Sequence, residues 1–278
     1  MRQIVKRLKS TPAYAAFRQD SKAVQRWLAL PRYVGSTYTC PVCGTGLRRF
    51  KPIWKSFVRK LEEHGFVHPL DSLETFNVAA HTCPACGASD RERLYALYLE
   101  DRFRDLDKSR RYTLVDFAAS PGLSRRLRAL SWLAYRTADL YRAGVDDRVD
   151  ISDMAIYGDG AIDMFICSHV LEHVPDDRRA MRELFRVLKP GGFGIVMVPL
   201  VVGVEDTHED RSIVAPAARW RYYAQDDHLR LYGRRDFVRR LEEAGFNVLQ
   251  LGADRFGRER FRRAGIHENS VLYVAERR

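Results

Sequence analysis

The chain has 278 residues, 46% of them hydrophobic, and a formal net charge of +11 at pH 7. This length can hold one large domain and a small one, each with its own core. No uncharged apolar run is long enough to cross a bilayer, and residues 1–30 lack the continuous apolar segment of a signal peptide. These features exclude helical membrane spans, and we expect a cytoplasmic protein.

The positive charge favours an anionic partner, such as RNA, an acidic small molecule or an anionic membrane surface. Because the arginines are spread along the chain, a solvated basic surface explains the charge equally well. Residues 2–9 interleave basic and apolar side chains at helical spacing. We interpret residues 1–30 as a basic amphipathic arm, which either makes peripheral contact with a membrane or RNA, or packs on its own domain.

Residues 31–88 contain a repeated cysteine pattern. The pentapeptides Cys40-Pro-Val-Cys43-Gly44 and Cys83-Pro-Ala-Cys86-Gly87 share one spacing, in which both thiolates can reach a single tetrahedral ion. The pattern resembles the paired knuckles of zinc ribbons. Disulfides and a redox dithiol are the alternatives, but a cytosolic location disfavours the first and two matched copies disfavour the second. Four thiolates leave no open coordination position, so we expect structural Zn²⁺.

The segment between the two pairs carries aromatic residues, which we expect to form a small core of their own. The histidines near the pairs are substitute ligands if one cysteine does not bind. A fifth cysteine, Cys167, lies in an apolar run and is interpreted as a buried core residue. The aromatic residues are Phe50, Trp54, Phe57 and Phe66, and the histidines are His64, His68 and His81.

Residues 89–278 alternate apolar runs of strand type with helical patterns, which predicts a doubly wound α/β sheet of Rossmann-like type. One helix is predicted after Pro175 up to Leu188, and another over residues 235–245. Two strands after the last helix suit a sheet whose final strand is antiparallel. The predicted strands are residues 112–117, 133–138, 164–167, 193–198, 246–251 and 270–275.

Several loops after these strands carry recognisable motifs. Residues 114–122, LVDFAASPG, contain Asp116 two positions before an eroded Gly-x-Gly-x-Gly pattern, with Ala118 and Ser120 at the first two glycine positions and Gly122 at the third. The next strand ends in Asp139. The runs 150–154, 163–174 and 182–192 follow, the last reading RELFRVLKPGG. A dehydrogenase would require G-x-G-x-x-G after the first strand, which residues 118–123 do not supply.

Together these motifs resemble class I S-adenosylmethionine-dependent methyltransferases over about residues 110–255, and within them the broad ubiquinone-biosynthesis-like group. The resemblance implies a seven-stranded methyltransferase sheet, with a small zinc ribbon in front, and S-adenosylmethionine as cofactor. It assigns Asp116, Ala118, Ser120 and Gly122 to the methionine end of the cofactor and Asp139 to the ribose. It further assigns Asp153 and Met154 to the adenine, Ser168 to the end of the fourth strand in the cofactor site, and His169 to the floor of the acceptor pocket.

The insertion after the fifth strand offers a candidate base. His228 can deprotonate an oxygen or nitrogen nucleophile, oriented by Asp226 or Asp227, although His228 and Arg230 can equally cap the following helix and bind each other's acidic neighbours. The acidic stretch 205–210 is interpreted as a solvated loop and not as a metal cluster.

Three functions follow from the sequence. The first is methylation of a small-molecule or glycan-precursor acceptor, with the ribbon as a lid. The second is an RNA methyltransferase whose ribbon and basic surface hold the backbone, and the third is a non-catalytic zinc adaptor on a methyltransferase scaffold. We place the first ahead, because no aromatic stripe for stacking bases is evident.

Overall fold

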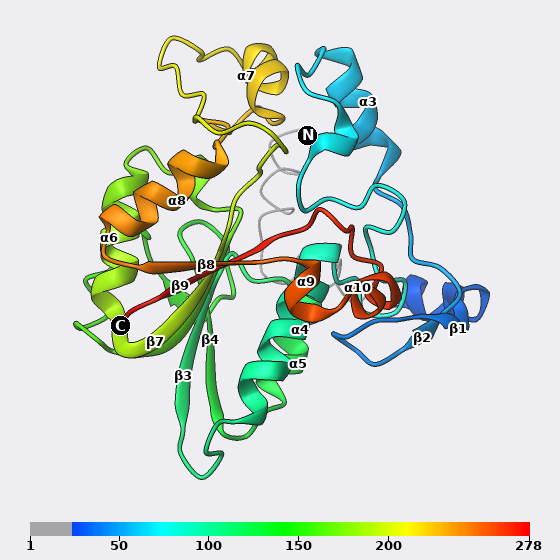
Figure 1. Ribbon diagram of the computed structural model, residues 1–278, viewed down its shortest axis with the longest axis horizontal. Helices are drawn as coiled ribbons and strands as arrows, with labels where there is room; N and C mark the ends of the chain where they lie inside the picture. The colour runs from blue at the N-terminus through cyan, green and yellow to red at the C-terminus, as the bar shows by residue number, and fades with distance from the viewer. Residues whose placement is uncertain (1–23) are drawn as a thin grey trace, which may run out of the picture.

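The computed structural model describes residues 24–278, and the basic pattern at residues 2–9 lies outside them. Figure 1 shows a central sheet with helices on both sides, α4 and α5 on one and α6 and α8 on the other. The seven strands are in the order β5-β4-β3-β6-β7-β9-β8, and only β9 runs antiparallel to its neighbours. The strands are β3 (Tyr112–Phe117), β4 (Leu133–Asp139), β5 (Asp147–Arg148), β6 (Ile162–Ser168), β7 (Leu188–Met197), β8 (Asn247–Leu251) and β9 (Leu272–Glu276).

All six predicted strands are present, and the last is antiparallel as expected. The seventh, β5, was not predicted because it has only two residues and therefore no periodicity. The two predicted helices are α6 (Asp177–Val187) and α8 (Arg234–Glu243). One expectation was wrong: α9 (Ala253–Phe256) and α10 (Arg258–Ala264) lie between β8 and β9, so the chain does not end with two strands in succession.

The α/β part of the chain, which contains the seven-stranded sheet, begins at α4 (Asp90–Arg104), and α5 (Pro121–Arg128) follows β3. Ser89 starts α4 with a capping box, in which its side chain accepts from the Glu92 N–H and the Glu92 carboxylate accepts from the Ser89 N–H. Buried residues of the strands and of α4 to α6 form one continuous core around the sheet. None of the helices in residues 24–278 is both long and apolar enough to cross a membrane.

The two cysteine knuckles form a small module with its own cluster of buried residues, beside the antiparallel pair β1 (Val34–Thr39) and β2 (Gly46–Leu47). Arg93 on α4 joins this module to the main sheet. Its side chain is fully buried, lies over the Phe50 ring at 3.9 Å, and donates to five carbonyl oxygens. These belong to Ala80, His81 and Ala88 of the module and to Ala264 and Gly265 after α10.

The aromatic residues between the cysteine pairs do not form a core of their own, contrary to expectation. Phe50 belongs to the knuckle module, and Trp54 is 62% exposed. Phe57 and Phe66, at α3 (Lys55–Glu63) and after it, pack on Trp220 of α7 (Pro216–Tyr223). The segment between the two cysteine pairs therefore packs against the insertion after β7. Both lie at the same end of the sheet (Figure 1).

Candidate functional site

The strands β3, β4 and β6 are parallel, so their carboxyl ends lie at the same end of the sheet. The loops that follow these strands therefore meet there. The predicted cofactor residues are distributed over these loops. Asp116, inside β3, is 3% exposed, and its carboxylate accepts a hydrogen bond from Tyr135 across 2.7 Å. Burial raises the pKa of Asp116 to about 7. Tyr135 also contacts Ser124 of α5, so it connects the Asp116 carboxylate to the helix that follows the loop after β3.

Ala118 adopts a left-handed backbone conformation, with φ of 58°, at the first position of the eroded glycine pattern. The turn that glycine makes without strain is thus kept although the residue has changed. Ser120 precedes α5 without capping it, and its buried hydroxyl has no hydrogen-bond partner within the described residues. Gly122 is buried, and a Cβ there would lie 3.1 Å from the Cys86 carbonyl oxygen. The close contact at Gly122 is therefore with the second cysteine knuckle.

Asp139 ends β4 and is half-buried. One carboxylate oxygen accepts from the N–H groups of Tyr141 and Arg142 at 2.8 and 2.9 Å, which fixes its orientation at the edge of the sheet. The Arg142 side chain donates to the Ala119 carbonyl at 2.6 Å and so connects the loops after β4 and β3. Sequence reasoning missed Arg142, because exposed arginines are numerous in this chain and only the fold brings this one to the cofactor edge.

The structure separates the two residues expected at the adenine. Asp153 has a 66% exposed side chain, with Arg179 at 3.8 Å. Met154 is fully buried in the core, and its N–H donates to Glu183 at 2.8 Å. The side chain and the N–H of Met154 are thus both engaged within the protein. Asp153 therefore has the more accessible side chain of the two, and both adenine assignments stay predictions.

A cavity of about 300 Å³ lies between the ends of β6 and β7 and the segment before the sheet. One wall is aromatic and comes from residues 53–76. The other wall comes from the sheet edge and from the insertion after β7, and it carries three histidines. The lining includes Trp54, Phe57, Phe76, His81, Arg91, His169, His173, Pro199 and His228.

His169 follows β6 with a φ of 55°, a conformation that is strained for a non-glycine residue. Arg91 donates from Nη1 to His169 Nε2 at 2.7 Å, so the ring proton lies on Nδ1. Burial, and secondarily the charge of Arg91, lower the pKa of His169 to about 4. Ser168, just before it, bonds through Oγ to Tyr95 Oη at 2.6 Å. His169 is therefore a neutral residue of the cavity wall whose lone pair is engaged by Arg91.

His228 lies at the same cavity, but its expected partners were wrong. Its Nδ1 contacts the Tyr223 carbonyl at 2.7 Å and its Nε2 contacts Gln225 at 2.8 Å. The Asp227 side chain is 67% exposed and lies instead 3.5 Å from His173 Nδ1. Because a carbonyl only accepts, the His228 proton is on Nδ1, and Nε2 has the lone pair. Burial lowers the pKa of His228.

Arg230 is a structural residue, but it does not cap α8 as the alternative interpretation held, since Gly233 starts that helix without a side-chain cap. It is 1% exposed and donates to the carbonyls of Leu171, Val174 and Pro175 and to the Glu209 carboxylate. Within residues 24–278, the acidic side chains of the 205–210 stretch do not gather into a possible metal group; Asp206 pairs with Arg235 and Glu209 with Arg230.

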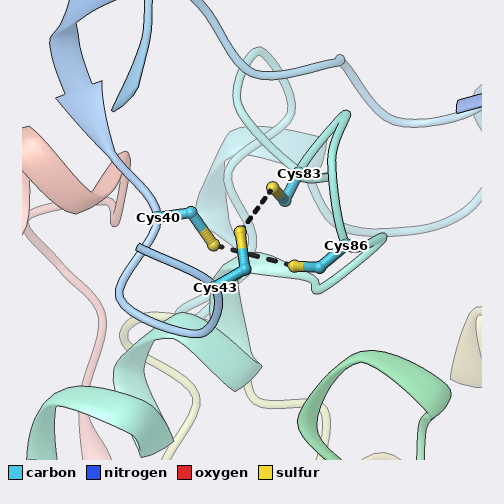
Figure 2. A group of neighbouring side chains, drawn as sticks. All are labelled: Cys40, Cys43, Cys83 and Cys86. Atoms are coloured by element: carbon cyan, nitrogen blue, oxygen red, sulfur yellow. Dashed lines mark hydrogen bonds between the residues drawn. The ribbon is translucent and has the colours of Figure 1, made fainter. Parts of the chain in front are cut away.

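The four knuckle cysteines point toward one another (Figure 2). Their sulfur atoms all lie within 4.8 Å of each other, with 3.8 Å between Cys40 and Cys86 and 3.9 Å between Cys43 and Cys83. Gly44 and Gly87 have φ of 73° and 83° and donate to the carbonyls of Cys40 and Cys83. All the cysteines are free thiols in the structure, and Cys167 is fully buried in the core, as expected.

The strand order β5-β4-β3-β6-β7-β9-β8, with β9 alone antiparallel, places the expected cofactor loops at the switch point beside β3. A family model described as a methyltransferase domain matches residues 88–251. The chain belongs to this methyltransferase family. The matched domain is that of an S-adenosylmethionine-dependent methyltransferase, and its match begins directly after the second knuckle, just before α4.

Curated relatives match only a short stretch. An uncharacterized methyltransferase of Mycobacterium sp. (strain KMS) is 38% identical over 53 residues, which are 19% of this chain and 21% of that protein. A protein of Mycobacterium sp. (strain JLS) with the same description gives the same identity and coverage. The matched stretch thus spans about a fifth of the length of these relatives.

Solved structures resemble the chain at low identity. Phosphoethanolamine N-methyltransferase 2 of Haemonchus contortus is 14% identical, with a TM-score of 0.46, covering 71% of this chain and 54% of that one. The CurJ carbon methyltransferase is 16% identical, with a TM-score of 0.43, covering 68% of this chain and 57% of that one.

Proposed function

We propose that this protein transfers a methyl group from S-adenosylmethionine to a small-molecule acceptor held in the cavity beside His169. The observation that carries the proposal is the enclosure of this cavity. Its aromatic wall, from residues 53–76, faces the ends of β6 and β7, where His169 follows the last residue of β6. A space of about 300 Å³ lined by apolar and aromatic groups, with a few polar ones, suits a small organic molecule.

The donor is assigned to the adjoining loops after β3, β4 and β6. Asp139 offers the carboxylate oxygen that faces away from Tyr141 and Arg142, and a carboxylate can accept both ribose hydroxyls. Ala118, Ser120 and Gly122 shape the loop at the methionine end, and Asp153 stands at the adenine end. Ser168 and Asp116 stabilise this edge through Tyr95 and Tyr135.

Transfer from a sulfonium is an in-line displacement by a donor with a good leaving group, so positioning supplies much of the rate. The methyl carbon moves to the acceptor nucleophile as the carbon–sulfur bond breaks, which leaves neutral S-adenosylhomocysteine. Arg91 and the aromatic wall orient the acceptor and exclude water. His228 has its lone pair on Nε2, where it accepts from the Gln225 amide at 2.8 Å, so it can take the nucleophile's proton once the acceptor displaces Gln225, whereas the lone pair of His169 is held by Arg91.

We assign the four cysteines to structural Zn²⁺. Zinc–sulfur bonds of about 2.3 Å in a tetrahedron place the sulfurs about 3.8 Å apart, and two of the sulfur pairs here are separated by 3.8 and 3.9 Å. Four thiolates and one Zn²⁺ carry a net charge of −2, which compensates the buried Arg93 guanidinium next to the knuckles. The ion would hold the module that supports α5 and the cavity wall.

Calorimetry with S-adenosylhomocysteine tests the donor site. The wild-type chain should bind, and Asp139→Ala should lose most of the affinity, because the ribose hydroxyls lose their acceptor. Asp159→Ala, at an exposed aspartate on another loop, is the matched control and should bind as the wild type does. Equal binding by wild type and Asp139→Ala, or no binding by either, would refute the assignment.

A further inference from the structure

Glu172 is a buried acid beside the neutral imidazole of His169. It is 0% exposed, and neither carboxylate oxygen has a hydrogen-bond partner within residues 24–278. The closest approach is His169 Nδ1, 3.2 Å from Oε1, but this contact lacks hydrogen-bond geometry. A carboxylate in this position costs several kcal/mol unless a cation or a set of donors satisfies it.

Two further donor groups converge on this carboxylate. Glu172, His173 and His228 each offer one ligand atom, and these three atoms all lie within 4.8 Å of one another. His228 Nε2 is 4.0 Å from Glu172 Oε1. Two ligands with zinc bonds of about 2.1 Å lie about 3.4 Å apart, so modest side-chain movement closes the group around one ion.

The outer contacts of both histidines orient them as ligands. His228 donates from Nδ1 to the Tyr223 carbonyl at 2.7 Å, which leaves the lone pair on Nε2, 4.0 Å from Glu172 Oε1; the Gln225 amide donates to this lone pair at 2.8 Å, and a bound ion would take its place. His173 Nδ1 faces the Asp227 carboxylate at 3.5 Å. A carbonyl or carboxylate behind the far ring nitrogen is the usual support for a metal-binding histidine, because it fixes the tautomer and strengthens the ligand.

We propose that Glu172, His173 and His228 form a second metal site, which binds a divalent transition ion of the zinc class at the floor of the acceptor cavity. Two imidazoles and one carboxylate favour such an ion over Mg²⁺, which prefers oxygen ligands and keeps its waters. Because His173 and His228 both line the cavity, the open coordination position faces the acceptor. This site differs from the cysteine site, which has four protein ligands and no open position.

The site deepens the proposed function, on which its role toward the acceptor rests. An oxygen-bearing acceptor bound to the ion loses its hydroxyl proton more easily, since the cation stabilises the resulting oxyanion. The oxyanion attacks the methyl carbon, and the proton passes to solvent. With the ion in place the His228 lone pair is used for ligation, so His228 no longer serves as the proton acceptor.

Cobalt titration of chelator-stripped full-length protein tests the site without measuring activity. The wild type should bind two Co²⁺ per chain, one with thiolate-to-cobalt charge-transfer absorption and one without it. Glu172→Gln and the double variant His173→Gln/His228→Gln should each bind only the first ion. His64→Gln, at a half-buried histidine stacked on Trp220, is the control and should bind both.

The thiolate absorption reports that each variant is folded, because it needs both knuckles in place. Binding of a single thiolate-bound ion by the wild type, retention of the second ion in both variants, or occupancy by Mg²⁺ alone would each overturn the proposal. Calorimetry with S-adenosylhomocysteine on the same samples separates this result from the donor-site assignment, since that assignment depends on Asp139 and not on the metal group.

Discussion

Arg91 donates a hydrogen bond to His169 across 2.7 Å, from α4 to the residue that follows β6. This contact fixes the His169 tautomer with its proton on Nδ1, 3.2 Å from the buried carboxylate of Glu172. A cation, a neutral imidazole and an anion therefore lie in succession, and the first two, Arg91 and His169, line the cavity.

Removing the cation should change the protonation of His169. Burial and Arg91 lower the pKa of His169 to about 4, so Arg91→Leu should raise it toward its ordinary value. Histidine ring signals in a two-dimensional NMR titration measure this shift. Arg102→Leu, at an exposed arginine of the same helix, is the control. An unchanged His169 titration in Arg91→Leu would show that Arg91 does not control the protonation of this histidine.

Ala118→Gly should stabilise the chain. Alanine at a φ of 58° stores on the order of 1 kcal/mol of backbone strain, which glycine does not have. The gain, reduced by the greater entropy of an unfolded glycine, is expected to be about 0.5 kcal/mol in urea unfolding. Ala129→Gly, at an exposed alanine of negative φ, should destabilise instead. A loss of stability in Ala118→Gly would contradict the strained turn.

The pKa of Asp116 predicts a pH-dependent stability. Its folded pKa, about 7, lies above the ordinary aspartate value of 3.8, so its contribution to stability is present at low pH and is lost as the pH rises from about 4 to 7. Asp116→Asn, which carries no charge, should gain on the order of 2 to 3 kcal/mol relative to wild type between pH 5 and pH 8. Urea unfolding at both pH values measures this gain, with Asp159→Asn as the control. A difference that is the same at both pH values would refute the raised pKa.

Gly122→Ala should destabilise the chain by about 1 to 3 kcal/mol, because the added Cβ meets the backbone of Cys86 and of Ala88, which cannot move easily. The distances are 3.1 Å to the Cys86 oxygen and 3.3 Å to the Ala88 nitrogen. Gly158→Ala is the matched control, since a Cβ there has no atom within 4 Å among the described residues. Zinc retention against a chelator should fall in Gly122→Ala alone. Equal behaviour of the two variants would contradict the contact.

The fold was predictable from residue 110 onward because the hydrophobic residues of each long strand and helix there recur with a clear period, and each element ends at a recognisable turn. The short β5 and the helices α9 and α10 carry too few residues for periodicity to reveal them. The knuckle cysteines were found from spacing alone, since their ligand geometry is local in the sequence.

The candidate site was less predictable, because its contacts join distant segments. His169 and Glu172 stand in one motif, yet their neighbours come from α4 and from the insertion after β7. Asp227 was expected to orient His228 because the two are adjacent in the sequence. The backbone turns at Ala224, with a φ of 69°, and the Asp227 carboxylate lies near His173 instead. Met154 was assigned by its place in a motif, and only packing shows that its side chain belongs to the core.

The aromatic wall of the cavity comes from residues 53–76, which precede the matched domain at residues 88–251. A protein that shares only that domain has the loops of the proposed donor site and the strands β3 to β8, but not the aromatic wall of the cavity. Related proteins can therefore differ in the acceptor they bind through the segment that precedes the matched domain, while the proposed cofactor site stays the same. Grafting residues 24–87 of this chain onto a related domain would transfer selectivity without altering the cofactor.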